Sequence, residues 1–573
     1  MREELLNITD LHIGFTTEGR TNEVIKGIDL RIQKGEIVGL VGESGSGKSV
    51  TGLSILGLLP EINTKISGSI EFIHAGRSKE IVGLNDSGFK GIKGKAISMI
   101  FQEPMSSLNP VLTCGYQVDE MSRLHLKYTK SQAKETTLEL FRKVGLPDPA
   151  RIYNSYPHQI SGGQIQRVMI AMAISCNPDL LIADEPTTAL DVTIQKKILD
   201  LLLEIRDEFG ISILFISHDL GVIRSITDRV YVMYRGQIVE EGLTGDLLQH
   251  PKHLYTRGLI ACKPPLHKKL ERLPVVSDFV NIEESSGLYT FSNAEKKIDP
   301  KVIIARTTSS AEVLLEVKDL VVKYPLQRNF WGKVTSYLKA VDGVSFYINK
   351  GESLGVVGES GCGKSTLGRA LVHLEKADSG AAFLHKKDLF KQSASEWKKT
   401  AKKIQIIFQD PYSSLNPKMK IGEAILEPMI VHELFKSGHE RRQRLDQLLD
   451  QVGLLKIHAD RYPHEFSGGQ RQRISIARAL ALEPELLICD ESVAALDVSV
   501  QSQVLNLLKD LKEELGLSML FITHDMSVVN FIADRIFVMN KGQIVESGNA
   551  HTIIQSPAND YTQRLVEAIP VWS

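Results

Sequence analysis

Residues 42–49 read GESGSGKS, and residues 358–365 read GESGCGKS. Each stretch follows a short apolar run rich in β-branched residues, EIVGLVG or SLGVVG, and precedes a segment with helical spacing of apolar residues. The pattern GxxxxGK[ST] between a strand and a helix is typical of a phosphate loop, whose glycines let backbone N–H groups turn toward a phosphate. The sequence therefore predicts two phosphate loops in an α/β nucleotide-binding fold.

Each loop ends in a lysine and a serine, Lys48 and Ser49 in the first and Lys364 and Ser365 in the second. The lysines would reach the β- and γ-phosphates of a bound nucleotide. The serine hydroxyls would ligate Mg²⁺.

Other motifs recur in the same order. FQEPMSSLNP (101–110) returns as FQDPYSSLNP (408–417), and LLIADE (180–185) returns as LLICDE (486–491). The offset between copies is 316 residues at the phosphate loops and 306 at LLIADE. The repeat predicts two homologous domains within the chain.

Two acidic residues close the LLIADE strand, and their copies close LLICDE. Asp184 and Asp490 are placed to hold Mg²⁺, and Glu185 and Glu491 to orient or deprotonate an attacking water. Phosphoryl transfer needs mainly positioning and charge neutralisation, so a carboxylate, a lysine and a metal suffice.

Two further pairs are candidates for the same site. His218 and His524 end the next apolar strand, where a side chain could touch the γ-phosphate and the water. Gln102 and Gln409 would ligate Mg²⁺ from a loop and could report nucleotide to a partner surface.

SGGQ occurs at residues 161–164 and again at 467–470, each time at an expected helix start. Such a start binds anions, but the motif holds no general base, metal carboxylate or activated nucleophile. Because each domain already has a phosphate loop, the anion that SGGQ contacts is expected to come from elsewhere.

Composition narrows the class of protein. The chain has 68 Lys and Arg against 69 Asp and Glu, so its net charge of −1 does not indicate nucleic-acid binding. The N-terminus lacks a signal peptide and no apolar run is long enough to span a bilayer, so we expect a soluble, cytoplasmic protein. Five scattered cysteines predict neither a zinc site nor disulfides; we expect them reduced and mostly buried.

We predict a first domain at residues 1–269, a polar linker at 270–312 and a second domain at 313–573, since the repeat fades and Ser and Thr gather between the copies. Each domain is expected to combine its parallel sheet with an antiparallel β subdomain and a helical subdomain between FQ and SGGQ.

The first copy resembles ABC-type ATPases motif by motif. GESGSGKS, Gln102, ISGGQ, LLIADEP, ALD and His218 correspond in order to Walker A, Q-loop, signature, Walker B, D-loop and H-loop, and the second copy matches equally well. In that family two domains pair head to tail, and each signature loop covers the nucleotide on the opposite Walker A. The resemblance implies two composite sites within one chain, coupled by the D-loop residues Asp191 and Asp497. It also implies adenine stacking on Phe15 and Tyr324.

The resemblance gives the following site residues. Catalysis is expected from Glu185, His218, Glu491 and His524, and Mg²⁺ binding from Ser49, Gln102, Asp184, Ser365, Gln409 and Asp490. ATP contacts are expected from Phe15, Gly42, Ser44, Gly45, Gly47, Lys48, Ser49, Val50, Tyr324, Gly358, Ser360, Gly361, Gly363, Lys364, Ser365 and Thr366. The signature contacts are expected from Ser161, Gly162, Gly163, Gln164, Ser467, Gly468, Gly469 and Gln470.

More narrowly, the SSLNP extensions, YPHQISGGQIQR and the tail segments HPKHLYTRGLIACKPPL and SPANDYTQRLVEAIP resemble the paired ATPases of peptide/nickel-type ABC importers, fused in one chain. Departures are Ile165 where the other copy has Arg471, Ser492 in place of the usual proline, and a lone Cys262. None removes a catalytic residue.

This resemblance implies ATP hydrolysis that powers uptake of peptides or similar small solutes. The implied partners are two transmembrane permeases and a solute-binding protein, with no nucleic acid, and the implied place is the inner face of the cell membrane. Two alternatives stay open: a soluble tandem ABC ATPase acting on ribosomes or nucleic acid, and the ATPase of an exporter. A long charged helical linker would favour the first alternative, and residues 270–312 show no such pattern.

Overall fold

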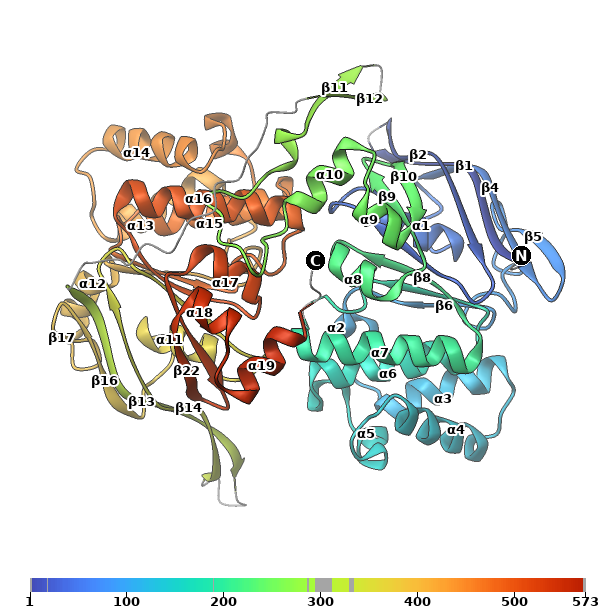
Figure 1. Ribbon diagram of the computed structural model, residues 1–573, viewed down its shortest axis with the longest axis horizontal. Helices are drawn as coiled ribbons and strands as arrows, with labels where there is room; N and C mark the ends of the chain where they lie inside the picture. Colours follow the sequence, from blue (N-terminus) through green and yellow to red (C-terminus); the bar gives the residue numbers. More distant parts are fainter. Residues whose placement is uncertain are drawn as a thin grey trace. The chain divides into compact units, whose positions relative to one another are not determined.

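The computed structural model describes residues 3–17, 19–188, 190–285, 288–293, 312–328 and 334–569. The chain folds into two compact units, each holding one copy of the repeat (Figure 1). The first unit comprises Met1–Leu190, Ile194–Ile260 and Phe279–Ala294, and the second Asp191–Thr193, Ala261–Asp278 and Glu295–Ser573. The expected tandem α/β fold is confirmed.

A six-stranded sheet forms the centre of the first unit, in the order β10-β9-β3-β8-β7-β6. Every residue of β3, β7 and β8 is buried, which explains their near-continuous apolar sequences: helices cover both faces of a parallel sheet. Only β10 runs antiparallel to its neighbour. The strands are β3 (Ile37–Val41), β6 (Ile97–Ile100), β7 (Leu180–Asp184), β8 (Ser212–Ser217), β9 (Arg229–Tyr234) and β10 (Gln237–Leu243).

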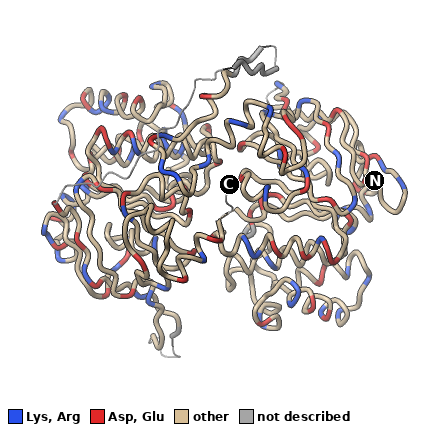
Figure 2. Tube along the Cα trace, viewed as in Figure 1, with Lys and Arg blue, Asp and Glu red and all other residues tan. Residues whose placement is uncertain are grey.

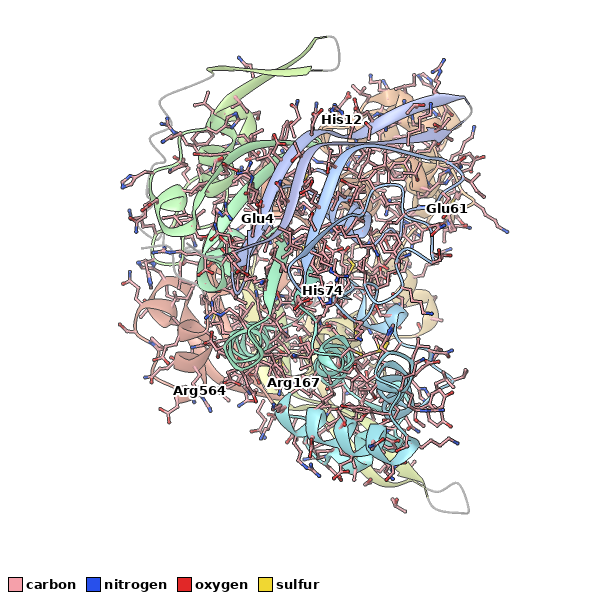
Figure 3. All side chains as sticks on the ribbon, turned by 90° about the vertical axis from the view of Figure 1, so that its right-hand side faces the viewer. Glu4, His12, Glu61, His74, Arg167 and Arg564 are labelled. Carbon is pink, nitrogen blue, oxygen red and sulfur yellow. The ribbon has the colours of Figure 1, made fainter. Side chains whose placement is uncertain are left out.

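A second, antiparallel sheet has the order β2-β1-β4-β5. Leu6 and Ile8 on β1 are buried in the core, while His12 on the same strand is partly exposed. Figure 3 labels Glu4 and His12, which lie on this strand. This one-sided burial gives the alternating pattern seen in the sequence. The strands are β1 (Glu4–Thr17), β2 (Arg20–Gln33), β4 (Thr64–His74) and β5 (Arg77–Glu80).

The helices of the first unit divide into those that flank the sheets and a helical subdomain. Helices α3, α4 and α5 form the subdomain at the end of the unit away from the antiparallel sheet (Figure 1). The helices are α1 (Lys48–Ile55), α2 (Pro104–Ser107), α3 (Cys114–His125), α4 (Lys130–Lys143), α5 (Pro149–Asn154), α6 (Gly162–Ile174), α7 (Val192–Phe209), α8 (Leu220–Ile226), α9 (Thr244–Gln249), α10 (Leu254–Ala261) and the 3₁₀ turn η1 (Pro157–Gln159).

The second unit repeats this plan with the sheet orders β18-β19-β20-β15-β21-β22 and β14-β13-β16-β17. Its strands are β13 (Val313–Arg328), β14 (Val334–Asn349), β15 (Ser353–Val357), β16 (Ser379–Leu384), β17 (Lys387–Asp388), β18 (Ile404–Ile407), β19 (Leu486–Asp490), β20 (Ser518–Ile522), β21 (Arg535–Asn540) and β22 (Gln543–Asn549). Its helices are α11 (Lys364–Leu371), α12 (Ala394–Ala401), α13 (Ile421–Val431), α14 (Gly438–Gln451), η3 (Lys456–Asp460), η4 (Pro463–Glu465), α15 (Gly468–Leu480), α16 (Val498–Leu515), α17 (Met526–Ile532), α18 (Ala550–Gln555) and α19 (Asp560–Glu567).

The second unit contains a segment that precedes its repeat, Ala261–Asp278. Leu266, Leu270 and Leu273 of this segment are buried in the core of the second unit. Asn506 on α16 accepts a hydrogen bond from the Leu273 N–H and donates one to the Leu273 carbonyl, both at 2.9 Å. Part of the polar stretch predicted as a linker thus packs as a folded element, ending in η2 (Val276–Asp278).

The rest of that predicted linker is described only in part. It contains a pair of antiparallel strands, β11 (Val280–Ser285) and β12 (Leu288–Asn293). Residues 294–311 lie outside the described part of the chain, so the limits of the linker stay a prediction.

All five cysteines are free and buried, as expected. Acidic and basic residues are interspersed along both units in Figure 2, in line with the near-zero net charge. Within the described residues, no helix combines the length and apolar character needed to cross a bilayer.

Candidate functional site

Both phosphate loops lie between a buried strand and a helix that starts at the loop lysine. Gly47 before α1 has φ +106°, a left-handed conformation that favours glycine. A Cβ on Gly42 would lie 2.1 Å from the Met233 carbonyl oxygen. Gly363 and Gly358 repeat both features, with φ +107° and a Cβ position 2.2 Å from the Met539 carbonyl oxygen. The left-handed backbone favours glycine at Gly47 and Gly363, and the nearby carbonyl oxygens leave no room for a side chain at Gly42 and Gly358.

The loop lysines are buried and held by their own loops. Lys48 Nζ donates to the carbonyl oxygens of Gly42 at 2.8 Å and Glu43 at 2.9 Å. Lys364 Nζ donates to the equivalent carbonyls of Gly358 and Glu359, each at 2.8 Å. Each ammonium group is thus fixed at the loop.

The loop tips and first helical turns carry the other expected ATP contacts. Ser44, Gly45, Ser360 and Gly361 are exposed, so their backbone N–H groups are open to a ligand. Val50 and Thr366 follow the loop serines and are partly exposed.

The loop serines meet the strand-end aspartates. Ser49 Oγ donates to Asp184 Oδ1 at 3.0 Å, and Ser365 Oγ donates to Asp490 Oδ1 at 2.6 Å. Burial raises the pKa of Asp184 to about 6, although the Ser49 hydrogen bond opposes the shift. Burial likewise raises the pKa of Asp490.

The strand-end glutamate of the first unit lies at the centre of a hydrogen-bonded group. His218 Nδ1 lies 3.0 Å from Glu185 Oε2, and Gln102 Nε2 donates to the same oxygen at 3.2 Å. Burial raises the pKa of Glu185, but the hydrogen bond and charge of His218 outweigh burial and hold this pKa at about 2. The pKa of His218 is raised in turn, because Glu185 outweighs its burial.

The second unit assembles the same group. Gln409 Nε2 donates to Glu491 Oε2 at 2.8 Å, and His524 Nδ1 lies 3.5 Å from Glu491 Oε1. The pKa of Glu491 is lowered: burial raises it, but the neighbouring imidazole of His524 outweighs that effect. Each unit thus brings together the glutamate, histidine and glutamine side chains that the sequence predicted for its site.

The SGGQ motifs start α6 and α15. Gln164 Oε1 accepts the Ser161 N–H at 3.1 Å, and Gln470 Oε1 accepts the Ser467 N–H at 3.1 Å. The glutamines therefore close the helix starts as in a capping box. Ser161 and Gly162 are exposed, as are Ser467 and Gly468.

The second glycine of each motif packs against its own unit. A Cβ on Gly469 would lie 2.1 Å from Val500 Cγ1, and one on Gly163 would lie 3.1 Å from Ile194 Cγ2. The motif thus presents its first two residues to solvent.

The candidate adenine rings lie on the antiparallel sheets. Phe15 on β1 packs against the core of the first unit and is partly buried. Tyr324 on β13 is also partly buried, and its hydroxyl lies 3.5 Å from Thr366 Oγ1 near the start of α11. Adenine contact at both positions remains a prediction.

Two family models match this chain. The "ABC transporter" model matches residues 25–188 and 341–494, which include every motif from Walker A through Walker B in both copies. The chain belongs to the ABC transporter family. A model for the "Oligopeptide/dipeptide transporter, C-terminal region" matches residues 239–285 and 545–573. These matches confirm the resemblance to the peptide-type branch of ABC ATPases, and with it ATPase activity and ATP binding.

Curated relatives of this ABC ATPase match nearly its full length. The glutathione import ATP-binding protein GsiA of Salmonella choleraesuis (strain SC-B67) is 43% identical over 576 residues, 99% of this chain and 90% of the relative. GsiA of Escherichia coli (strain K12) is 43% identical over 575 residues, with the same two coverages. A solved ABC cassette, MJ0796, aligns with 41% of this chain at 29% identity and a TM-score of 0.37.

Sequence reasoning missed several features of the two ABC sites, namely a backbone conformation and three further side chains. Glu185 and Glu491 both adopt the left-handed backbone conformation, with φ +47°. Thr188 donates to Glu185 Oε2 at 2.8 Å. Tyr255 and Tyr561 reach the phosphate loops from the tail helices. Only the tyrosines left a signal, the YT pair that recurs in both tails.

Proposed function

We propose that this ABC ATPase hydrolyses ATP with Mg²⁺ at two sites and powers uptake of small peptides through two membrane permeases. The proposal rests above all on the match with glutathione import ATP-binding proteins over 99% of the chain. Complete sets of candidate catalytic groups in both units support two active sites.

The chemistry of the ligand set supports Mg²⁺. Each unit gathers a serine hydroxyl, a carboxylate and a glutamine amide, which are oxygen ligands of the kind that Mg²⁺ prefers. Asp490 Oδ2 is buried without a hydrogen-bond partner, so a ligand would satisfy it. When bound with ATP, Mg²⁺ would neutralise charge on the phosphates. Ser49, Gln102 and Asp184 would hold it in one unit.

The second metal site would use the matching side chains of the other copy. Its ligands would be Ser365, Gln409 and Asp490. Ser365 and Asp490 already share a hydrogen bond, so two of the three ligands are preorganised.

The glutamate and histidine of each unit would handle the attacking water. The low pKa of Glu185 keeps its carboxylate ionised at neutral pH, so it can accept a hydrogen bond from the attacking water and orient it. His218 holds that carboxylate in place and would contact the γ-phosphate. Glu491 and His524 would act in the same way.

We propose further that each signature loop covers the nucleotide bound to the other copy. The exposed Ser161 and Ser467 at helix N-termini support this role, since such positions attract phosphate. Asp191 and Asp497 would then couple the two sites.

A substitution tests this pairing. Ser467→Arg should impair nucleotide trapping at the site that contains Lys48, and Ser161→Arg should impair the site that contains Lys364. Nucleotide trapping measured at one site at a time, for example in chains in which only one of the two loop lysines is intact, tests both expectations. The opposite assignment would overturn the pairing.

A pocket beside the second Q-loop, next to exposed apolar side chains, supports a membrane-protein partner. A pocket of about 430 Å³ lies among β18, α13 and α15, lined in part by Phe408, Glu427, Val431 and Arg478. Val431 is 57% exposed and Ile430 next to it 54% exposed. The Q-loop residue Gln409 follows Phe408, so a permease docked here would sense the nucleotide site.

The partners and location follow from the importer assignment. A solute-binding protein would deliver the peptide to the permeases, and this chain would lie on the cytoplasmic face of the membrane, held there by the permeases. The transporter-specific tail region favours this reading over action on ribosomes or nucleic acid.

Uptake in cells tests the function. A strain that lacks this chain should take up labelled glutathione or dipeptides poorly and should recover when the wild-type chain is supplied. The double variant Lys48→Ala/Lys364→Ala should not restore uptake. Equal uptake with and without the chain, for a panel of labelled peptides, would contradict the proposal.

A further inference from the structure

Each tail helix starts at a fixed point beside the outer strand of the central sheet. In the first unit, the carboxylate of Glu240 on β10 accepts the N–H groups of Lys252 at 2.7 Å and His253 at 3.2 Å, just before α10. In the second unit, Glu546 on β22 accepts the N–H groups of Ala558 at 2.8 Å and Asn559 at 3.2 Å, just before α19. Both helix starts are therefore anchored in the same way.

The anchored helices carry buried tyrosines that reach the phosphate loops. Tyr255 is 0% exposed and Tyr561 8% exposed. The Tyr255 hydroxyl accepts the backbone N–H of Glu43 at 3.3 Å, and the Tyr561 hydroxyl accepts that of Glu359 at 3.0 Å. A hydrogen bond between residues about two hundred positions apart in the sequence thus recurs in both copies.

These hydrogen bonds share a peptide group with the loop lysine. The Gly42–Glu43 peptide donates its N–H to Tyr255, and its carbonyl oxygen accepts Lys48 Nζ at 2.8 Å. In the second unit the Gly358–Glu359 peptide is held by Tyr561 and by Lys364 in the same way. One peptide at the base of each loop is therefore fixed from both sides.

We propose that Tyr255 and Tyr561 are positioning residues for ATP binding, a role that rests on the proposed ATP sites. When the loop lysine turns to the phosphates of ATP, the carbonyl loses that partner, and the tyrosine keeps the peptide in place. The loop then presents its N–H groups to the phosphates without reorganising. The tail region of this branch thereby acts directly on the nucleotide site.

Phenylalanine substitutions in the full-length chain test the role, because they remove the hydroxyl and keep the ring. Tyr561→Phe, measured with Lys48→Ala to silence the other site, should raise the Kd of a fluorescent ATP analogue with Mg²⁺. One lost hydrogen bond corresponds to about a two- to tenfold rise in Kd. In an otherwise wild-type chain, Tyr255→Phe/Tyr561→Phe should raise KM by a similar factor and change kcat at saturating ATP by less than about twofold.

Tyr231→Phe is the matched control. Tyr231 is 2% exposed, and its hydroxyl accepts the backbone N–H of Arg31 at 3.2 Å and a guanidinium N–H of Arg229 at 3.4 Å, neither of which belongs to the phosphate loop. The other copy has Phe537 at this position, so phenylalanine fits the fold. Tyr231→Phe should leave KM unchanged, while its Tm should fall at least as much as that of Tyr255→Phe.

The outcomes separate this inference from the proposed function. Lys364→Ala measured with Lys48→Ala should abolish binding of the analogue. If it does and Tyr561→Phe leaves Kd unchanged, the positioning role is wrong and the phosphate loops stand. Equal shifts in KM for Tyr231→Phe and Tyr255→Phe also overturn the role, because a general loss of stability would then explain both. Unchanged binding in the double lysine variant overturns the phosphate-loop assignment and this inference with it.

Discussion

Leu53 on α1 occupies the position that Arg369 occupies on α11, five residues after the loop lysine in each copy. The Arg369 guanidinium lies 3.9 Å from Asp490 Oδ2, and its charge opposes the rise that burial causes in the pKa of Asp490. Leu53 offers Asp184 no such charge, and burial raises the pKa of that carboxyl to about 6. Two sites with the same candidate catalytic residues therefore hold their proposed metal carboxylates in different electrostatic environments.

The two signature helices also differ by an apolar residue in the first copy and an arginine in the second. Ile165 on α6 is 1% exposed and packs in the interior of the first unit. Its counterpart Arg471 on α15 donates through Nε to the carbonyls of Phe466 at 2.9 Å and Pro463 at 3.1 Å. The turn before the second signature is thus tied by hydrogen bonds, and the first is held at this point by apolar packing. The comparison teaches that the two copies of this chain share their candidate catalytic groups but differ in residues that contact or surround them.

The largest effect should come from a change that treats both copies alike. Glu185→Gln with Glu491→Gln should reduce ATP hydrolysis by about a hundredfold or more, because both carboxylates that orient water are lost. ATP binding should persist, as measured with a fluorescent analogue. The two single variants then report whether the sites contribute equally. Near-normal turnover in the double variant would contradict the catalytic assignment.

Acidification should separate the two sites. A proton occupies Asp184 below its pKa of about 6, and Mg²⁺ has to displace it. Mg²⁺ affinity at the first site should therefore fall about tenfold as the pH drops from about 7 to about 5, and stay constant well above pH 6. At the second site the loss should begin at lower pH, because Arg369 opposes the effect of burial.

Variants with one silenced lysine, Lys364→Ala or Lys48→Ala, allow each site to be titrated with Mg²⁺ alone. Identical pH profiles at the two sites would show that the Arg369 charge does not tune Asp490.

Exchanging the residues at positions 53 and 369 should shift the Mg²⁺ affinities of the two sites in opposite directions. At about pH 8, where both aspartates are ionised, Arg369→Leu removes a positive charge near the metal position and should tighten Mg²⁺ binding about two- to fivefold. Leu53→Arg should weaken it by a similar factor at the first site. The half-maximal Mg²⁺ concentration for ATP binding measures both. Shifts of the same sign in the two variants would contradict the comparison.

The smallest effect concerns stability of the second unit. Arg471→Ile should lower the free energy of unfolding by about 1 kcal/mol, since two carbonyls lose a donor that water replaces in part. Thermal unfolding followed by circular dichroism would show the lower Tm. Arg442→Ile is the control, because Arg442 on α14 is 49% exposed and pairs only with Asp446 at 3.7 Å among the contacts described. An equal loss in both variants would leave the signature comparison without support.

Much of each site could be read from the sequence. Lys48 and Ser49 sit within one short motif, and the Asp184–Glu185 pair ends one strand, so their roles follow from local order. Because these motifs recur, the same inference could be made in both copies. The helix starts at Ser161 and Ser467 were equally local, since a cap depends on residues three apart.

Other features depended on contacts that no local pattern encodes. The Tyr255–Glu43 hydrogen bond joins residues 212 apart and exists because α10 returns to the phosphate loop that follows β3. Residues 270–278 were predicted as linker because the stretch is polar, and residues 261–269 were assigned to the first domain. In the structure Ala261–Asp278 belongs to the second unit, and its three leucines fill the core of that unit. The charge of Arg369 mattered only once α11 brought it beside β19.

The sequence by itself determined the family, the order of the motifs and the identity of nearly every candidate ATP contact. Those follow from glycine geometry, apolar periodicity and capping, which act over a few residues. Only the tertiary structure decided which buried groups hold the loops, how the two carboxylate environments differ and where the tail packs. These depend on hydrogen bonds and charges whose strength is set by burial, and burial exists only after distant segments have packed together.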